Sequence, residues 1–113
     1  MQMFVLVLNR EEYLDPILER MLEADIGGAT ILDSTGMMRV LDEDNVDLPM
    51  MGVLRHFFSP ERKRSKTMFT LLEDNTIPRL MGIINDVTGG LDKPDTGIAF
   101  ALPTTFVEGV KLV

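Results

Sequence analysis

The sequence predicts a single α+β domain whose elements follow the order strand, helix, strand, strand, helix, strand. The chain has 113 residues, enough for one domain, and 45% of them are hydrophobic and 26% charged, as in ordinary globular proteins. Four runs have the apolar or β-branched character of strands, and two others repeat apolar residues at helical spacing. A chain that alternates these patterns folds as a sheet with helices packed on it.

The first strand and first helix come from the opening residues. Residues 3–8 are continuously apolar, which is typical of a central strand covered on both faces. A helix is predicted at about 15–25, with Asp15 as its cap and Gly27-Gly28 as its stop. The apolar residues of this helix are Leu14, Ile17, Leu18, Met21 and Leu22.

The next strands flank a long excursion. Residues 29–35 are polar and β-branched enough for an edge strand, and the sequence leaves open an extension through residues 37–41. Residues 42–66 show no sustained period of a strand or helix, so we expect one long loop. Strand character returns at residues 67–72. Loops of this length in compact domains tend to be functional, so the excursion is the first place to look for function.

The final helix and strand complete the pattern. Residues 73–76 supply capping chemistry for a helix that ends at Gly89. The apolar face of this helix consists of Ile77, Leu80, Met81, Ile84 and Val87. Residues 97–102 form the last strand, which Pro103 ends, and residues 104–113 add either a short strand or a tail.

Two βαβ halves with right-handed crossovers give a ferredoxin-like βαββαβ antiparallel sheet with helices on one face. The first strand has apolar residues pointing to both faces, so the face without helices should not be left to water. The pattern therefore predicts a homo-oligomer in which sheets pack together.

Charge is distributed unevenly along the chain. The net charge is −7, but residues 55–66 carry five basic residues against Glu61 alone, so this segment is +4 and the remainder −11. The acidic remainder argues against nucleic acid as a partner, and the basic segment indicates a local site for a protein partner or a small anion. The candidate partner-binding residues are Met50, Met51, Arg55, His56, Phe57, Phe58, Arg62, Lys63 and Arg64.

Other site classes lack the residues they need. The acidic run 42–47 has Val46 in the fifth position of a calcium-loop register and no glycine after it, so we expect no metal site there. The same carboxylates could instead pair with the basic run as an electrostatic latch. His56 is the single histidine and has no triad partner at a suggestive spacing, and the chain has no cysteine, so no catalytic residue is predicted.

The residues Thr88-Gly89, Asp95 and Phe100-Ala101-Leu102-Pro103, together with the order of elements and the long loop between the second and third strands, resemble the PII family of nitrogen regulatory proteins. The resemblance covers nearly the whole chain. It implies a homotrimer that binds an effector such as ATP or ADP in clefts between subunits and signals to a target protein through the long loop. The family's modified tyrosine has no counterpart, and Thr96-Gly97-Ile98 stand where a basic residue is expected after Asp95.

The resemblance and the glycine-rich turn together select the ligand-binding candidates Gly36, Lys66, Thr88, Gly89 and Lys93. Glycines let backbone N–H groups approach a phosphate, and Lys93 provides the opposite charge. The turn follows a helix, however, so the negative end of the helix dipole faces it, and an ordinary capped turn remains the alternative.

The function expected from the sequence is a PII-like regulator, not an enzyme, with a ligand-independent oligomeric docking scaffold as the alternative. The absence of cysteine fits a reducing, cytoplasmic compartment. The longest apolar run has six residues, whereas roughly 20 are needed to span a bilayer, so no membrane span is expected.

Overall fold

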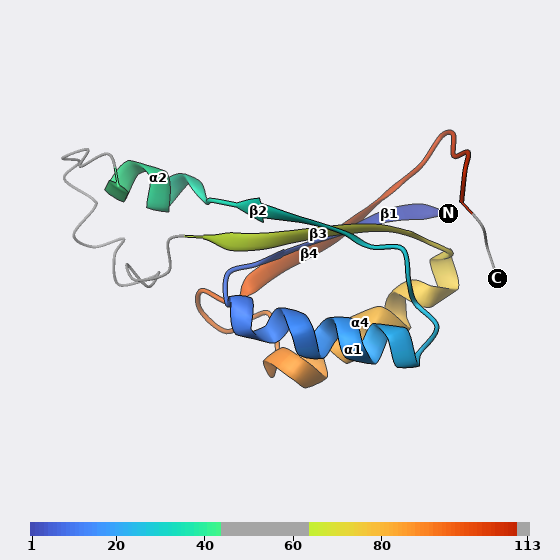
Figure 1. Ribbon diagram of the computed structural model, residues 1–113, viewed down its shortest axis with the longest axis horizontal. Coiled ribbons are helices and arrows are strands. Elements are labelled where there is room, and N and C mark those ends of the chain that lie inside the picture. The colour runs from blue at the N-terminus through green and yellow to red at the C-terminus, as the bar shows by residue number, and fades with distance from the viewer. Residues whose placement is uncertain (44–63, 111–113) are drawn as a thin grey trace.

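A computed structural model describes residues 1–43 and 64–110, and it confirms the α+β fold class (Figure 1). A four-stranded sheet carries helices α1 and α4 together on one face, while α2 lies beyond the end of β2. The described elements are β1 (Gln2–Leu8), the short 3-10 helix η1 (Glu11–Tyr13), α1 (Leu14–Glu23), β2 (Thr30–Ser34), α2 (Met37–Glu43), β3 (Ser65–Leu72), the 3-10 helix η2 (Asp74–Thr76), α4 (Ile77–Thr88) and β4 (Gly97–Pro103).

The strand order is β2-β3-β1-β4, and each neighbouring pair is antiparallel, which is compatible with a ferredoxin-like fold. The apolar strand β1 lies in the centre, and the more polar β2 lies at an edge, as their compositions predict. Phe4 pairs with Thr70 of β3 on one side and with Ala101 of β4 on the other.

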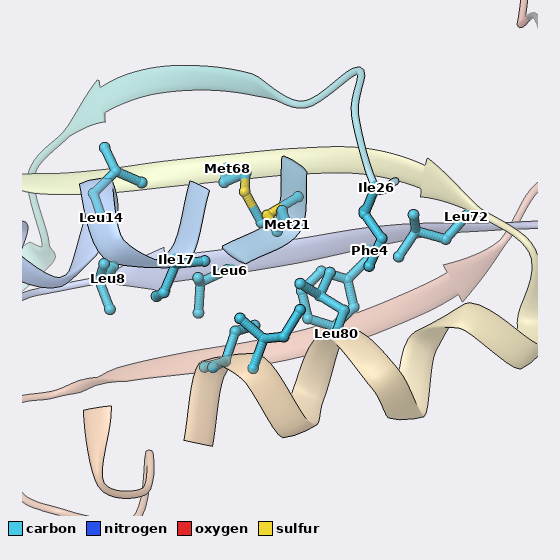
Figure 2. Close-up of a cluster of buried hydrophobic side chains, with 12 residues drawn as sticks. Phe4, Leu6, Leu8, Leu14, Ile17, Met21, Ile26, Met68, Leu72 and Leu80 are labelled. Carbon is cyan, nitrogen blue, oxygen red and sulfur yellow. The ribbon is translucent and has the colours of Figure 1, made fainter. Parts of the chain in front are cut away.

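The hydrophobic core fills the space between the sheet and the two helices (Figure 2). Every second residue of β1 points to the helices, and Phe4, Leu6 and Leu8 are fully buried there. Ile17 of α1 and Leu80 of α4 close over them, because helical spacing gives each of these helices one apolar stripe. An ion pair between Arg20 and Asp86, 3.3 Å apart, joins the exposed sides of the two helices.

The opposite face of the sheet carries apolar side chains with no helix over them in the part of the chain that the structure describes. On β4, the exposed fractions are 58% for Ile98, 44% for Phe100 and 40% for Leu102. The register pairs Val7, Val5 and Met3 of β1 with these three residues, so they share one face. We call this surface the open face.

Helix α1 begins and ends earlier than the sequence predicts. It starts at Leu14, so Asp15 lies in its first turn and does not cap it. Its C-cap is Ala24, after which Asp25 takes a left-handed conformation with φ of 59°, and the Ile26 N–H donates to the Met21 carbonyl at 2.8 Å. This is a Schellman ending with aspartate where glycine is usual, so Gly27-Gly28 is not the stop.

The two ends of the excursion predicted at residues 42–66 also differ from the prediction. Residues 37–41 do not extend a strand, because they belong to α2. Lys66 does not precede the third strand, since β3 already begins at Ser65. The excursion of 42–66 therefore starts in a helix and ends in a strand, and its residues 44–63 lie outside the described residues.

The end of α4 agrees with its prediction. Gly89 caps the helix with a φ of 80°, a conformation that glycine adopts without steric cost, and its N–H donates to the Asn85 carbonyl. After β4 the described residues 104–110 form no strand, and Thr104 is held by a hydrogen bond from its hydroxyl to the Met1 carbonyl at 3.0 Å. Within 1–43 and 64–110, the helices are too short or too polar to cross a bilayer.

Candidate functional site

The candidate site lies at the end of the sheet where β1 stops and β3 and β4 start. Asn9, just after β1, connects all three strands: its N–H donates to the Thr96 carbonyl at 2.9 Å, and its Oδ1 accepts a hydrogen bond from Ser65 Oγ at 2.9 Å. Thr96 and Ser65 are buried. Since the first residue of β3 and the segment before β4 are both hydrogen-bonded to Asn9, this end of the sheet has a fixed geometry.

Three of the five predicted ligand-binding residues meet in the turn after α4. The Thr88 hydroxyl is buried, donates to the Ile84 carbonyl at 2.8 Å and accepts from the Gly90 N–H at 3.1 Å. Lys93 folds back over Gly89 so closely that a Cβ at Gly89 would collide with the ammonium group. The turn therefore combines glycine backbone with a lysine charge near the carbonyl end of a helix, where a cation is favoured.

Lys66 is engaged elsewhere. Its Nζ donates to Asp33 Oδ1, the residue opposite it on β2, and Arg64 lies 3.9 Å from the other oxygen of the same carboxylate. The hydrogen bond from Lys66, helped by its positive charge, lowers the pKa of the Asp33 carboxyl. The same hydrogen bond raises the pKa of Lys66 and outweighs the effect of its desolvation.

Gly36 and Lys66 are not joined to the Thr88, Gly89 and Lys93 turn by any hydrogen bond or ion pair among the described residues. Gly36 is exposed just before α2, where its carbonyl accepts the Val40 N–H at 3.1 Å. Of the predicted partner-binding residues, Arg64 is exposed beside Asp33. The rest lie outside the described residues: Met50, Met51, Arg55, His56, Phe57, Phe58, Arg62 and Lys63.

A buried ion pair joins the segment before β4 to α2. Arg39 Nη2 donates to both carboxylate oxygens of Asp95, at 2.8 and 2.9 Å, and the side chains are only 7% and 9% exposed. Asp95 adopts a left-handed conformation with φ of 54°, which aspartate tolerates better than most residues. Charge-assisted hydrogen bonds of this kind are among the stronger polar contacts in proteins.

Sequence reasoning missed Arg39. It is the one charged residue within the run Met37-Met38-Arg39-Val40-Leu41, and a single cation in an apolar run signals a buried, paired charge. Its partner Asp95 was noticed through the family resemblance, but the two are 56 residues apart, so spacing could not connect them.

Comparison of the chain with protein-family models and with curated proteins finds no match. Among residues 1–43 and 64–110, no three histidine, aspartate or glutamate side chains gather as they would around a metal ion. The cations at this end of the sheet lie against protein groups: Arg39 pairs with Asp95, Lys66 pairs with Asp33, and Lys93 lies over the backbone of Gly89.

Proposed function

We propose that the protein is a PII-like signal-transduction regulator. A small anionic effector, an adenine nucleotide or another metabolite, would bind between subunits near the Thr88 to Lys93 turn. The segment 42–66 would then signal to a target protein. The observation that carries this proposal is the buried Arg39–Asp95 pair, because it ties the turn region before β4 to α2, where that segment begins.

The turn supports the anion part of the proposal. Lys93 is exposed, and its ammonium lies directly over the backbone of Gly89. A phosphate approaching Gly89 would meet this positive charge at once. For such a ligand to act as a signal it must favour one state of the α2 region over another, since equal affinity for both states shifts nothing.

The open face supports assembly. Its apolar side chains are exposed on an edge strand of the sheet, whereas a monomer usually covers such a surface. We propose that copies of the chain pack through this face in a homotrimer. The proposal includes a cytoplasmic location, which fits a chain without cysteine, and a binding role without catalysis.

A ligand-independent docking scaffold is the second candidate. It is favoured by the contact of Lys93 with Gly89, since the lysine already fills the space over the glycine backbone. In this case the oligomer would bind one partner protein, and no metabolite would change the affinity for that partner.

Calorimetric titration of ATP separates the two candidates. We expect saturable binding to the wild-type protein, and at least a tenfold weaker affinity in Lys93→Ala, because loss of a charge-assisted contact to a phosphate costs about 1.5 to 3 kcal/mol. Lys66→Ala tests the remaining cation of the predicted set. Arg79→Ala is the matched control, because Arg79 is exposed in the first turn of α4, at the other end of that helix. Absence of binding to the wild type would favour the docking scaffold.

A further inference from the structure

A cavity of about 760 Å³ lies at the end of the sheet opposite the Thr88 to Lys93 turn. Two segments border it, and Figure 1 shows both at this end: the connection from α1 to β2, and the stretch from the end of β3 through η2 into α4. The cavity arises because β2 pairs with β3 only as far as Phe69, whereas β3 continues to Leu72. Its volume is typical of sites for small molecules.

One wall of the cavity contains a buried hydroxyl group without a hydrogen-bond partner. Thr70 of β3 is 2% exposed, and its Oγ1 has no partner among residues 1–43 and 64–110. Thr70 pairs with Phe4, whose side chain lies beneath the helices, so the Thr70 side chain points to the same side of the sheet. Ile26 and Leu72 border the cavity there, and Figure 2 shows them at one end of the core. A buried polar group without a partner is destabilising, and a ligand in the cavity would supply the partner.

Charged groups of both signs border the same cavity. Arg79 lies in the first turn of α4, at the positive end of the helix dipole, and Asp25 and Glu73 belong to the two bordering segments. All three side chains are exposed, and none of them forms a salt bridge with another described residue. Gly27 and Gly28 leave space beside them, because a Cβ at either position would meet no other described part of the chain within 4 Å.

We propose that this cavity binds a free α-amino acid with an apolar side chain. The ligand carboxylate pairs with Arg79 and accepts a hydrogen bond from the Thr70 hydroxyl, and the ligand ammonium group pairs with Asp25 or Glu73. The ligand's own side chain packs against the apolar side chains of the cavity. They are Ile26, Phe69, Leu71, Leu72 and Val110. A ligand with one charge would leave the other sign unmatched, so a zwitterion fits better than a simple carboxylate or amine. This site is separate from the turn and does not rest on the proposed function.

Calorimetric titration of L-leucine tests the site, with Thr70→Val as the first variant. Valine keeps the shape of the side chain and removes the hydroxyl. We expect leucine to bind about fivefold more weakly, whereas the midpoint of thermal unfolding without ligand should stay equal or rise, because no hydrogen bond is lost. Thr67→Val is the matched control on the same strand. The Thr67 hydroxyl lies 2.7 Å from that of Ser34, so this variant should unfold at a lower temperature and bind leucine as the wild type does. A lower midpoint for Thr70→Val would overturn the proposal.

The charges are tested with ligands that each lack one of them. Isocaproate is leucine without its ammonium group, and isoamylamine is leucine without its carboxylate. Each should bind about tenfold more weakly than leucine. Arg79→Met should remove most of the difference between leucine and isoamylamine, because the carboxylate has lost its partner. Arg20→Met should preserve that difference, since Arg20 pairs with Asp86 on the outer side of the helices. Isocaproate or isoamylamine binding as tightly as leucine would contradict a site for amino acids.

The remaining outcomes separate this site from the proposed function. Failure of leucine, valine and phenylalanine alike to bind at millimolar concentration would overturn the proposal, and ATP binding by the same protein would leave the regulator standing. Leucine binding without ATP binding would support the cavity and contradict the nucleotide sensor. Because the cavity and the turn lie at opposite ends of the sheet, ATP should not compete with leucine. Competition would place both ligands at one site and would overturn the proposal of a separate one.

Discussion

Both faces of the sheet carry apolar side chains, but helices cover only one of them in the part of the chain that the structure describes. Phe4 and Leu6 are buried beneath α1 and α4, whereas Ile98 and Phe100, which lie beside Val7 and Val5 on the other face, remain about half exposed. A central strand that is apolar on both sides requires two covers, and the described chain supplies helices for one. The difference places the hydrophobic core on one face and leaves exposed apolar side chains of β4 on the other, which is the face that the proposed assembly would use.

Truncation on the helix-covered face should have the largest effect. Leu6→Ala should lower the free energy of unfolding by about 3 kcal/mol, because the side chain is fully buried and its loss leaves a cavity. Urea denaturation followed by circular dichroism measures the change. Leu22→Ala is the control: it removes the same side chain from a position that is 74% exposed, and it should change stability by less than about 0.5 kcal/mol. Equal losses for the two variants would contradict the assignment of the core.

A charge on the open face should act on assembly more than on folding. Phe100→Asp should shift the protein from an oligomer to a monomer in sedimentation velocity, since an unpaired carboxylate in an apolar interface is costly to bury. Its unfolding free energy as a monomer should fall by only about 1 kcal/mol, because the ring is already 44% exposed. Phe106→Asp provides the control, as Phe106 is exposed and lies outside the sheet. A monomeric wild type would refute association through this face.

The smallest effect concerns the Asp33–Lys66 pair at the β2 edge. Because the folded-state pKa of Asp33 is lowered, the pair's contribution to stability is complete above the unfolded value of about 3.9 and is lost as the pH falls through the folded pKa. Because the pKa of Lys66 is raised, the contribution is also lost as the pH rises through that pKa, above the unfolded value of about 10.4. NMR titration of the Asp33 carboxyl in Lys66→Met should show its pKa moving back toward the ordinary value.

Asp74 serves as the internal control for this titration. Its pKa is lowered by the hydrogen bond from the Gln2 amide and by the N-terminal ammonium group, neither of which involves Lys66. A shift of Asp74 in Lys66→Met would show that the substitution disturbs the fold, and an unchanged Asp33 would show that the ion pair is not formed in solution.

Sequence periodicity predicted the strands and helices that pack an apolar face against the core. It did not predict the boundaries that depend on the conformational preferences of individual residues. The central position of the apolar strand at residues 3–8 and the helix stop at Gly89 were both predicted from the sequence, and the structure confirms them. Residues 37–41 were assigned to a possible strand, yet methionine, arginine and leucine are all good helix formers, and only Val40 favours a strand. Helix α1 ends before Gly27-Gly28 because Asp25, which follows the C-cap Ala24, takes the left-handed conformation that glycine usually supplies. No hydrophobic pattern signals this substitution.

The candidate site was predictable only within one segment. Thr88, Gly89 and Lys93 lie within six consecutive residues, so the turn could be proposed from spacing, and the structure brings them together. Lys66 was assigned to the cleft, but its pairing with Asp33 depends on strand register across the sheet. Arg39 and Asp95 are brought together only by the tertiary fold. A single sequence does not show which distant residues are in contact.

The position of β1 in the middle of the sheet constrains how the chain acquires its fold. During synthesis β1 emerges first, followed by α1 and β2, yet β1 and β2 are not neighbours because β3 lies between them. The partners of β1 arrive much later: Leu8 pairs with Lys66, and Gln2 pairs with Pro103. Each pairing closes a long loop, and such non-local contacts slow folding. The first half of the chain therefore leaves the ribosome without a sheet to join, and we expect the apolar strand β1 to need protection from aggregation until β4 has been made.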